Sequence, residues 1–428
     1  MDNNIRVFMH ILNCSTKDES VITESVKEMI LMADWEVIHT LACKGKVVAL
    51  TFQKARDAIS YVMDENPATK DEFTKLLKKW ESETLYVACS QIIKNHEIIR
   101  IIKILNKKSI VPLVFKGIVL SDLYNEDWQR FSADADILAN DKYYDICNVL
   151  IEEHYIHDDI NSKENVAVYK KGNVTFEIHK RLWEDYDNDI IKALERYEVG
   201  DIGNSHLIKI DKALMYTMNP IKHLYYLFFH LIKHISYTGT SIRSIMDISL
   251  FMQRYSPEID FTQFVTQMQQ LGYSQCAKAV FSICKEFFEL DEDLIPVEFT
   301  GDSEYAQVML QRMYENGAIT GYNMDYNDTS MSVAYQVSYT DGYHYNKHLS
   351  IYMKMLFPGR YNLGPDYVYA RNNPLLLPVA WIHRALHNIL CTKKLFTVFK
   401  SDVNSAKEKI NLLNELNISG NINTKENK

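Results

Sequence analysis

Residues that interrupt helices are scarce in this sequence, which has 14 glycines and 9 prolines among 428 residues. Leucine, isoleucine, lysine and glutamate are frequent, and together with the shortage of helix breakers they favour long helices. The apolar share of 47% is ordinary for a globular protein. We therefore expect a predominantly helical globular chain.

Paired cysteines are also lacking. The seven cysteines are an odd number, lie far apart and form no Cys-x-x-Cys pair. This pattern excludes a disulfide framework and a zinc ribbon, and it indicates reduced thiols in a cytoplasmic protein.

The sequence has no run of about 18 apolar residues, so no transmembrane helix is expected. Its start, MDNNIRVFMHILNCS, has no cationic region followed by a long apolar stretch and does not resemble a signal peptide.

An excess of positive charge is absent, since the formal net charge is −9. Proteins that bind nucleic acid without sequence preference are usually basic, because neutralising phosphates dominates their affinity. We therefore expect no extended nucleic acid as a partner, and polymerisation or tailing of nucleic acid is disfavoured. A small basic patch is compatible with this charge.

The length allows two or three packed units, because single cores rarely exceed about 250–300 residues. Apolar residues recur at three- and four-residue spacing before residue 108 and again after Pro220. We predict an N-terminal helical region at 1–108, an α/β core at 109–200, a C-terminal helical region at 201–400 and a polar tail at 401–428.

The core is predicted from short β-branched runs that alternate with helical patterns. IVPLVF at 110–115 and DADILA at 134–139 read as strands, each followed by a helical pattern. A hairpin follows, with NVAVYK and VTFEIHKRL on either side of the turn at 171–173. The expected fold class is α+β, with a small mixed sheet flanked by N- and C-terminal helical regions.

Three carboxylates are the most informative feature of this core. Asp134 and Asp136 are two residues apart on a predicted strand and so face the same side, and Glu177 occupies the polar face of the hairpin strand. Carboxylates this close repel each other unless a cation lies between them, and Mg²⁺ accepts such oxygen ligands. A one-residue slip of the hairpin would turn Glu177 to the apolar face.

Lys116 and Gly117 stand between a strand and a helix, where backbone N–H groups and a lysine can bind phosphate. Arg130, four residues before Asp134, is a further candidate for phosphate contact. The alternative for these residues is an ordinary loop glycine beside solvated side chains.

These motifs together resemble the uncharacterised nucleotidyltransferase family often found in bacteria, within the polymerase-β-like nucleotidyltransferase superfamily. The resemblance is carried by Phe115-Lys116-Gly117, by Arg130 through Asp136, and by Glu177 through Trp183. It extends over roughly residues 80–395. It departs from the superfamily in having Lys-Gly where Gly-Gly or Gly-Ser is commoner, and a small Ala135 between the aspartates.

The resemblance implies a metal-dependent enzyme that transfers a nucleoside monophosphate from a nucleoside triphosphate to a hydroxyl of a small molecule or protein, releasing pyrophosphate. Asp134, Asp136 and Glu177 would bind Mg²⁺ or Mn²⁺, with Glu177 alternatively acting as general base. Lys116 and Gly117 would hold the triphosphate. The alternative is a catalytically silent nucleotide sensor of the same fold. The sequence gives no oligomeric state.

A histidine stripe accompanies these motifs. His223, His230 and His234 fall on one face of a predicted helix. Zinc binding is one interpretation, although His-x-x-x-His here lacks the glutamate of the protease motif. We expect His179, His230, His234 and Arg243 to contribute to nucleotide binding. The alternatives are histidines in a helix-packing seam and a structural ion pair between Arg243 and Asp247, which are four residues apart on a predicted helix.

Overall fold

The structure is a computed structural model, and we describe the residues whose placement is defined. These are 2–17, 19–159, 161–162, 165–182, 202–237, 240–301, 303–315, 357, 363, 367, 369–370, 373–391 and 416.

The chain forms two compact units, which we describe separately. The first consists of Met1–Phe228, Ile242–Asp260 and Cys284–Ile295, and the second of Phe229–Ser241, Phe261–Ile283 and Pro296–Lys428. The predicted tail at 401–428 lies outside the described residues except for Leu416.

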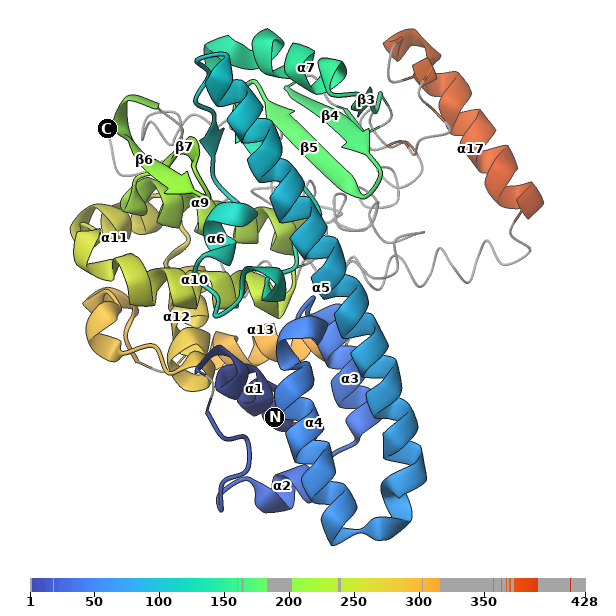
Figure 1. Cartoon of the computed structure of the whole chain (residues 1–428), viewed down its shortest axis with the longest axis vertical. Coiled ribbons are helices and arrows are strands. Elements are labelled where there is room, and N and C mark those ends of the chain that lie inside the picture. Colours follow the sequence, from blue (N-terminus) through green and yellow to red (C-terminus); the bar gives the residue numbers. More distant parts are fainter. Residues whose placement is uncertain are drawn as a thin grey trace, which may run out of the picture. The chain divides into compact units, whose positions relative to one another are not determined.

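Helices make up the N-terminal part of the first unit, as predicted. They are α1 (Asn3–Lys17), α2 (Lys27–Leu31), α3 (Trp35–Lys44), α4 (Val48–Glu65) and α5 (Lys70–Lys107). Helix α5 is the longest, with 38 residues. Its first half packs on α4 and its second half runs along the sheet, so one helix joins the N-terminal helices to the core (Figure 1).

A seven-stranded mixed sheet forms the core of the first unit, with strand order β3-β4-β5-β2-β1-β7-β6. The strands are β1 (Leu113–Val114), β2 (Ala135–Leu138), β3 (Ile156–His157), β4 (Val166–Lys171), β5 (Val174–His179), β6 (Ser205–Ile210) and β7 (Ala213–Met218). Strand β2 is parallel to β5 and antiparallel to β1, while β4 and β5 form the predicted hairpin. The sheet and the surrounding helices confirm the predicted α+β class.

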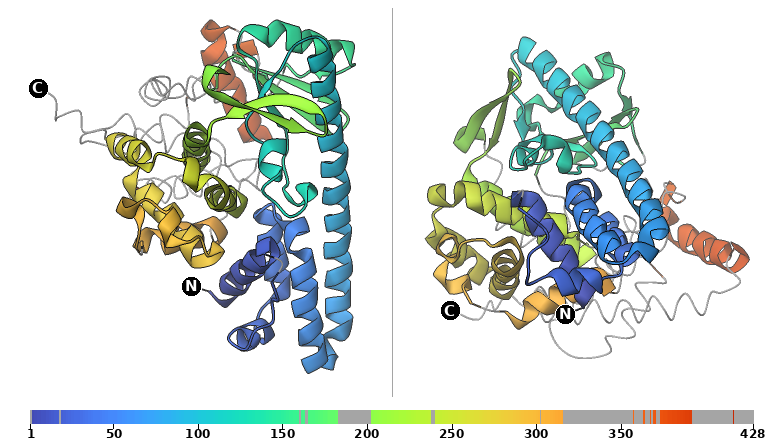
Figure 2. Two further views of the ribbon diagram at one scale, coloured as in Figure 1. Left: turned by 60° about the vertical axis from the view of Figure 1, so that its left-hand side comes forward. Right: turned by 60° about the horizontal axis from the view of Figure 1, so that its bottom comes forward.

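One face of the sheet packs against the second half of α5 and against α7 (Tyr143–Glu152), whose buried apolar side chains share one core with those of the strands. Figure 2 shows the second half of α5 running beside the sheet. The apolar side chains of β2 and β5 that face these helices are buried: Ala135, Ile137, Phe176 and Ile178. Because side chains alternate along a strand, the residues between them face the opposite side. The acidic residues of the core therefore share the face that α5 and α7 leave open.

The hairpin β6–β7 was not predicted from the sequence. It lies inside 201–400, where we expected only helices, and it adds two strands to the sheet through the parallel pairing of β7 with β1. The helical prediction holds beyond it, with α9 (Pro220–Tyr237), α10 (Ile242–Tyr255), α11 (Phe261–Gln270), α12 (Ser274–Phe288), α13 (Glu304–Glu315) and α17 (Leu377–Cys391).

The second unit has its own apolar packing. Phe264, Phe281 and Phe299 contact one another, with ring centroids 6.0–6.3 Å apart. Among the residues described in either unit, no helix has the length and apolar character that crossing a membrane requires.

Candidate active site

The register between β2 and β5 sets the geometry of the site. Asp136 pairs with Glu177 across the two parallel strands, and Leu138 pairs with His179. Asp136, Glu177 and His179 each offer a ligand atom, and these atoms all lie within 4.8 Å of one another. The hairpin is therefore not shifted by one residue, and Glu177 lies on the polar face of β5, as predicted.

Asp136 is at the centre of the cluster and is fully buried. Its Oδ1 atom lies 2.9 Å from Nζ of Lys116 and 3.3 Å from Nε2 of His179. Burial alone would raise the pKa of Asp136, but the charges of Lys116 and His179 hold it below its usual value. Asp136 is therefore a permanent anion at physiological pH.

Lys116 is held in its charged form by the same carboxylates. Burial alone would lower its pKa, but Asp136, together with Tyr226, Asp134 and Glu177, raises it well above the usual value. The Lys116 ammonium also lies 5.6 Å from the ring centroid of Tyr226. One lysine thus partly neutralises three carboxylates.

Two buried atoms of the cluster lack a hydrogen-bond partner within the described part of the chain. They are Oδ2 of Asp136 and Nδ1 of His179. A buried carboxylate oxygen without a partner is rare because desolvation is then uncompensated. A residue with such an oxygen, grouped with a second carboxylate and an imidazole, fits the ligand chemistry of a divalent cation.

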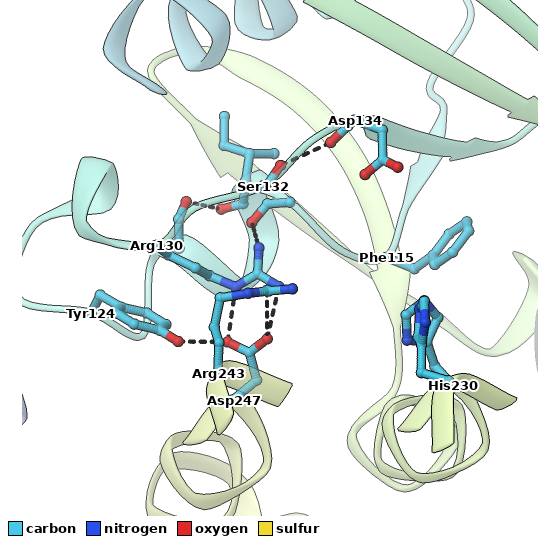
Figure 3. A network of polar contacts seen from close by, with 12 residues as sticks. Phe115, Tyr124, Arg130, Ser132, Asp134, His230, Arg243 and Asp247 are labelled. Atoms are coloured by element: carbon cyan, nitrogen blue, oxygen red, sulfur yellow. Dashed lines mark hydrogen bonds and ion pairs between the residues drawn. The ribbon is translucent and has the colours of Figure 1, made fainter. Parts of the chain in front are cut away.

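Asp134 stands just before β2 and is partly buried. The Ser132 hydroxyl donates a hydrogen bond to the backbone carbonyl of Asp134, at 2.9 Å, which fixes the chain as it enters the strand. In Figure 3 the carboxylate of Asp134 lies apart from that of Asp247. Asp134 is not part of the Asp136–Glu177–His179 ligand group, although its charge acts on Lys116.

The Lys116-Gly117 turn connects β1 to the short helix α6 (Ile118–Ser121), as predicted. Gly117 has φ 53° and ψ −113°, a conformation that residues with a side chain rarely adopt. A Cβ atom at this position would also lie 3.4 Å from the carbonyl oxygen of Asp134. Glycine therefore lets this turn approach the start of β2 closely.

Arg130 is not a solvated loop side chain but the centre of a buried network (Figure 3). Its Nε and Nη2 atoms donate to the two carboxylate oxygens of Asp247, both at 2.9 Å, and Nη1 donates to the Gly117 carbonyl at 3.2 Å. Asp247 also accepts a hydrogen bond from Nη1 of Arg243, at 3.1 Å, and one from the Tyr124 hydroxyl, at 2.7 Å. The predicted pairing of Arg243 with Asp247 is confirmed.

The three histidines of the stripe all lie on α9, as predicted, but they have different partners. His223 is buried, and its Nε2–H donates to the Phe115 carbonyl at 2.8 Å. Burial lowers the pKa of His223 to about 4, so it is neutral. His230 and His234 belong to the second compact unit, where their Nε2 atoms lie 3.2 Å apart. Their predicted contact with nucleotide stays a prediction.

A second group of potential ligands lies in the N-terminal helices. His39 and Cys43 of α3 and Glu83 of α5 also bring donor atoms within 4.8 Å of one another. Here the His39 ring bonds Glu83 at 2.8 Å, and the Cys43 thiol donates to the same carboxylate at 3.5 Å. We assign no cation to this group, because its members already satisfy each other.

Sequence reasoning missed Tyr124, Tyr226 and Lys94. Lys94 is buried on α5 and continues the apolar stripe of Ile98 and Ile101 toward the N-terminus of the helix. A lysine at a core-facing position of the predicted helix was the signal in the sequence that could have identified Lys94.

The first unit combines a mixed sheet that has helices on one face with carboxylates beside a Lys-Gly turn on the other face. These are the features that the resemblance to the nucleotidyltransferases implied. Comparison with models of protein families matches residues 32–289 to the family described as uncharacterised nucleotidyltransferase. The match covers more than half of the chain, so the chain belongs to this family. It begins earlier and ends earlier than the stretch 80–395 expected from the motifs, and so includes α3 to α5. Comparisons with curated proteins and with solved structures found no match.

Proposed function

We propose that this protein is an active, metal-dependent nucleotidyltransferase that transfers a nucleoside monophosphate from a nucleoside triphosphate to a hydroxyl group of a small molecule or protein. Membership of the family supports the general activity. The observation that carries the metal-dependent mechanism is the buried Oδ2 of Asp136, which has no hydrogen-bond partner among the described residues, in a residue that shares a ligand group with Glu177.

Asp134, Asp136 and Glu177 are the proposed ligands of Mg²⁺ or Mn²⁺, and His179 lies close enough to join them. A bound cation supplies charge neutralisation for the phosphates and for the oxygens that attack and leave. Mixed oxygen and nitrogen donors are accepted by Mn²⁺ as well as by metals that prefer imidazole, so His179 favours Mn²⁺ over Mg²⁺ if it coordinates.

In the proposed reaction the acceptor hydroxyl oxygen forms a bond to the α-phosphorus. The bond from that phosphorus to the oxygen bridging the α- and β-phosphates breaks, and pyrophosphate leaves with the bond's electron pair. The alternative proposed role of Glu177 is to accept the hydroxyl proton, because it is the most exposed carboxylate of the ligand group, with 32% of its side chain accessible.

Lys116 and Gly117 are proposed to hold the triphosphate. The Lys116 ammonium lies 2.9 Å from Asp136, so a phosphate bound at this turn would meet a positive charge beside the proposed metal ligands, and Gly117 permits the positive φ of the turn. Arg130 is proposed to act as a positioning residue: all three donor groups named above are engaged, and one of them holds the carbonyl of Gly117.

A transfer assay tests this proposal. The protein is incubated with each labelled nucleoside triphosphate, with Mg²⁺ or Mn²⁺, and with a cell extract that supplies acceptors. We expect label to appear on an acceptor with the wild type and not with Asp134→Asn/Asp136→Asn. Identical products from both proteins would overturn the proposal. Nucleotide binding by the wild type without turnover would instead identify a sensor.

A further inference from the structure

Four cationic side chains from separate segments of the first unit interact electrostatically with Asp134. They are Lys46, between α3 and α4, Lys94 on α5, Arg130, before β2, and Arg243 on α10. The first two come from the N-terminal helices, which the sequence analysis treated as packing elements.

Lys94 is the most unusual of the four because it is buried, with 3% of its surface accessible, and has no ion-pair partner within the described segments. Its ammonium lies 5.7 Å from the ring centroid of Phe131. Buried lysines are rare unless they are paired, since removing an ammonium from water is costly.

The surrounding contacts fix Lys94 in place. One helical turn before it, the Gln91 amide donates to the Ser132 carbonyl at 3.2 Å and accepts from the Ser132 N–H at 3.1 Å. The adjacent Asn95 donates to Asp127 at 3.0 Å. These bonds join α5 to the loop that precedes Asp134, so Lys94 faces that loop.

Arg243 also has a hydrogen-bond donor without a partner among the described residues. Its Nη1 atom pairs with Asp247, while Nε is buried without a hydrogen-bond partner among the described residues. Figure 3 shows its guanidinium beside that of Arg130, with both directed at Asp247. A single carboxylate therefore serves two arginines.

Lys46 is brought to the cluster by close packing of its neighbour. A Cβ atom on Gly45 would lie 2.9 Å from Cγ2 of Ile242, the residue before Arg243. Lys46 itself has φ 58° and an exposed side chain, which places it at the solvent side of the group.

The balance of charge in this group is positive, because four cations face the carboxylates of Asp134 and Asp247. Burial lowers the pKa of Lys94 to about 8, and the charges of Arg130 and Arg243 act in the same direction against that of Asp134. A ligand with several negative charges would relieve this excess. The group is continuous with the proposed phosphate turn, since Arg130 donates to the Gly117 carbonyl.

We propose that Lys46, Lys94 and Arg243 bind the terminal phosphates of the nucleoside triphosphate and hold the pyrophosphate that leaves. This inference rests on the proposed function and adds to it that the N-terminal helices supply part of the substrate site. The family match, which begins at residue 32, includes both lysines.

The test uses inorganic pyrophosphate as the probe, in calorimetric titrations of the full chain with chelator present so that no metal contributes. We expect Lys94→Met and Lys46→Met each to weaken binding by about 10-fold or more, as for the loss of a charged hydrogen bond. Lys78→Met, on the exposed side of the same helix, is the matched control and should bind as the wild type does. Inorganic phosphate should bind more weakly than pyrophosphate, and a non-hydrolysable triphosphate should compete with it.

A second readout separates ligand binding from a structural role. Because the substitution removes a buried charge without an ion-pair partner among the described residues, Lys94→Met should be at least as resistant to urea as the wild type. If Lys94 had a structural role, the same substitution would lower the resistance to urea. Failure of wild type to bind pyrophosphate, or equal binding by wild type and both lysine variants, would overturn the inference. Label transfer by the wild type with an unchanged KM in Lys94→Met would also overturn it while leaving the proposed function intact. Pyrophosphate binding that depends on Lys94, without any transfer of label, would support the phosphate site and overturn the proposed catalytic activity.

Discussion

Asp136 and Asp247 are both buried, both charged and both paired with cations, yet their surroundings differ. Both oxygens of Asp247 accept hydrogen bonds, from Tyr124 and Arg130 at Oδ1 and from Arg130 and Arg243 at Oδ2. Oδ1 of Asp136 is contacted by Lys116 and His179. Its Oδ2 has no partner among the described residues.

This difference distinguishes a structural carboxylate from one that can bind a ligand. Burying a charge is tolerated when hydrogen bonds satisfy it, as they do for Asp247, which joins α10 to the loop before β2. Asp136 retains an oxygen without a hydrogen-bond partner among the described residues, and Glu177 belongs to the same group of potential ligands. Burial alone therefore does not identify the site, whereas the missing partner does.

The largest expected effect is on activity, at Asp136. Asp136→Asn should lower the rate of nucleotidyl transfer by about 10³-fold or more, because cation binding stabilises transition-state charge by several kcal/mol. The measurement is single-turnover transfer of label at saturating triphosphate. Asp141→Asn, an exposed aspartate outside the site, is the control. A loss of less than 10-fold for Asp136→Asn would remove Asp136 from the mechanism.

Asp247 should show the opposite behaviour, with its main effect on stability. Asp247→Ala leaves Arg130 and Arg243 buried without a carboxylate, which costs about 3–5 kcal/mol of unfolding free energy. Urea denaturation followed by circular dichroism measures this loss. The comparison between the two aspartates would break down if Asp247→Ala were as stable as the wild type.

The next effect depends on pH and concerns His223. Its native pKa of about 4 lies below the usual 6.5, so the unfolded chain takes up a proton first as the pH falls. Stability should be unaffected above pH 6.5 and should decrease by up to about 3 kcal/mol between pH 6.5 and 4. Denaturation at several pH values should show a shallower decrease for His223→Gln. Equal slopes would show that His223 titrates normally in the folded protein.

The smallest effect is expected at Gly117. Alanine at φ 53° and ψ −113° is strained by about 1–3 kcal/mol. Gly117→Ala should raise the KM for triphosphate more than it lowers kcat, because the turn is proposed to hold the ground-state phosphates. Gly172→Ala is the control for the loss of stability that backbone strain causes. Gly172 also has positive φ, but it has nothing within 4 Å of its Cβ position. Unchanged KM in Gly117→Ala would separate the turn from the site.

Much of the core could be predicted because its signals are local. The alternation of Val174, Phe176 and Ile178 with Glu177 and His179 predicted the faces of β5, and burial follows that pattern as far as Ile178, whereas His179 is buried as well. The hairpin β6–β7 was missed because its turn residues, Asp211 and Lys212, both have positive φ, where Asn-Gly or Asp-Gly is the usual signal.

The candidate site was predicted only in part because much of it is assembled by distant contacts. The spacing of Asp134 and Asp136 identified the carboxylates, but nothing local links Arg130 to Asp247, 117 residues away. Lys94 was not identified because it lies in an ordinary helical pattern. The apolar stripe of that helix continues into polar residues, and these face a loop.

Direct measurement of Mn²⁺ binding tests the central claim most sharply, because it does not depend on the acceptor. The free Mn²⁺ signal in electron paramagnetic resonance is followed while protein is added, for the wild type, Asp136→Asn, Glu177→Gln and the control Asp141→Asn. We predict that the wild type and Asp141→Asn bind Mn²⁺ and that affinity falls by about 10- to 100-fold or more in the other two. Equal binding by all four proteins, or none by the wild type, would contradict the assignment of Asp136 and Glu177 as metal ligands.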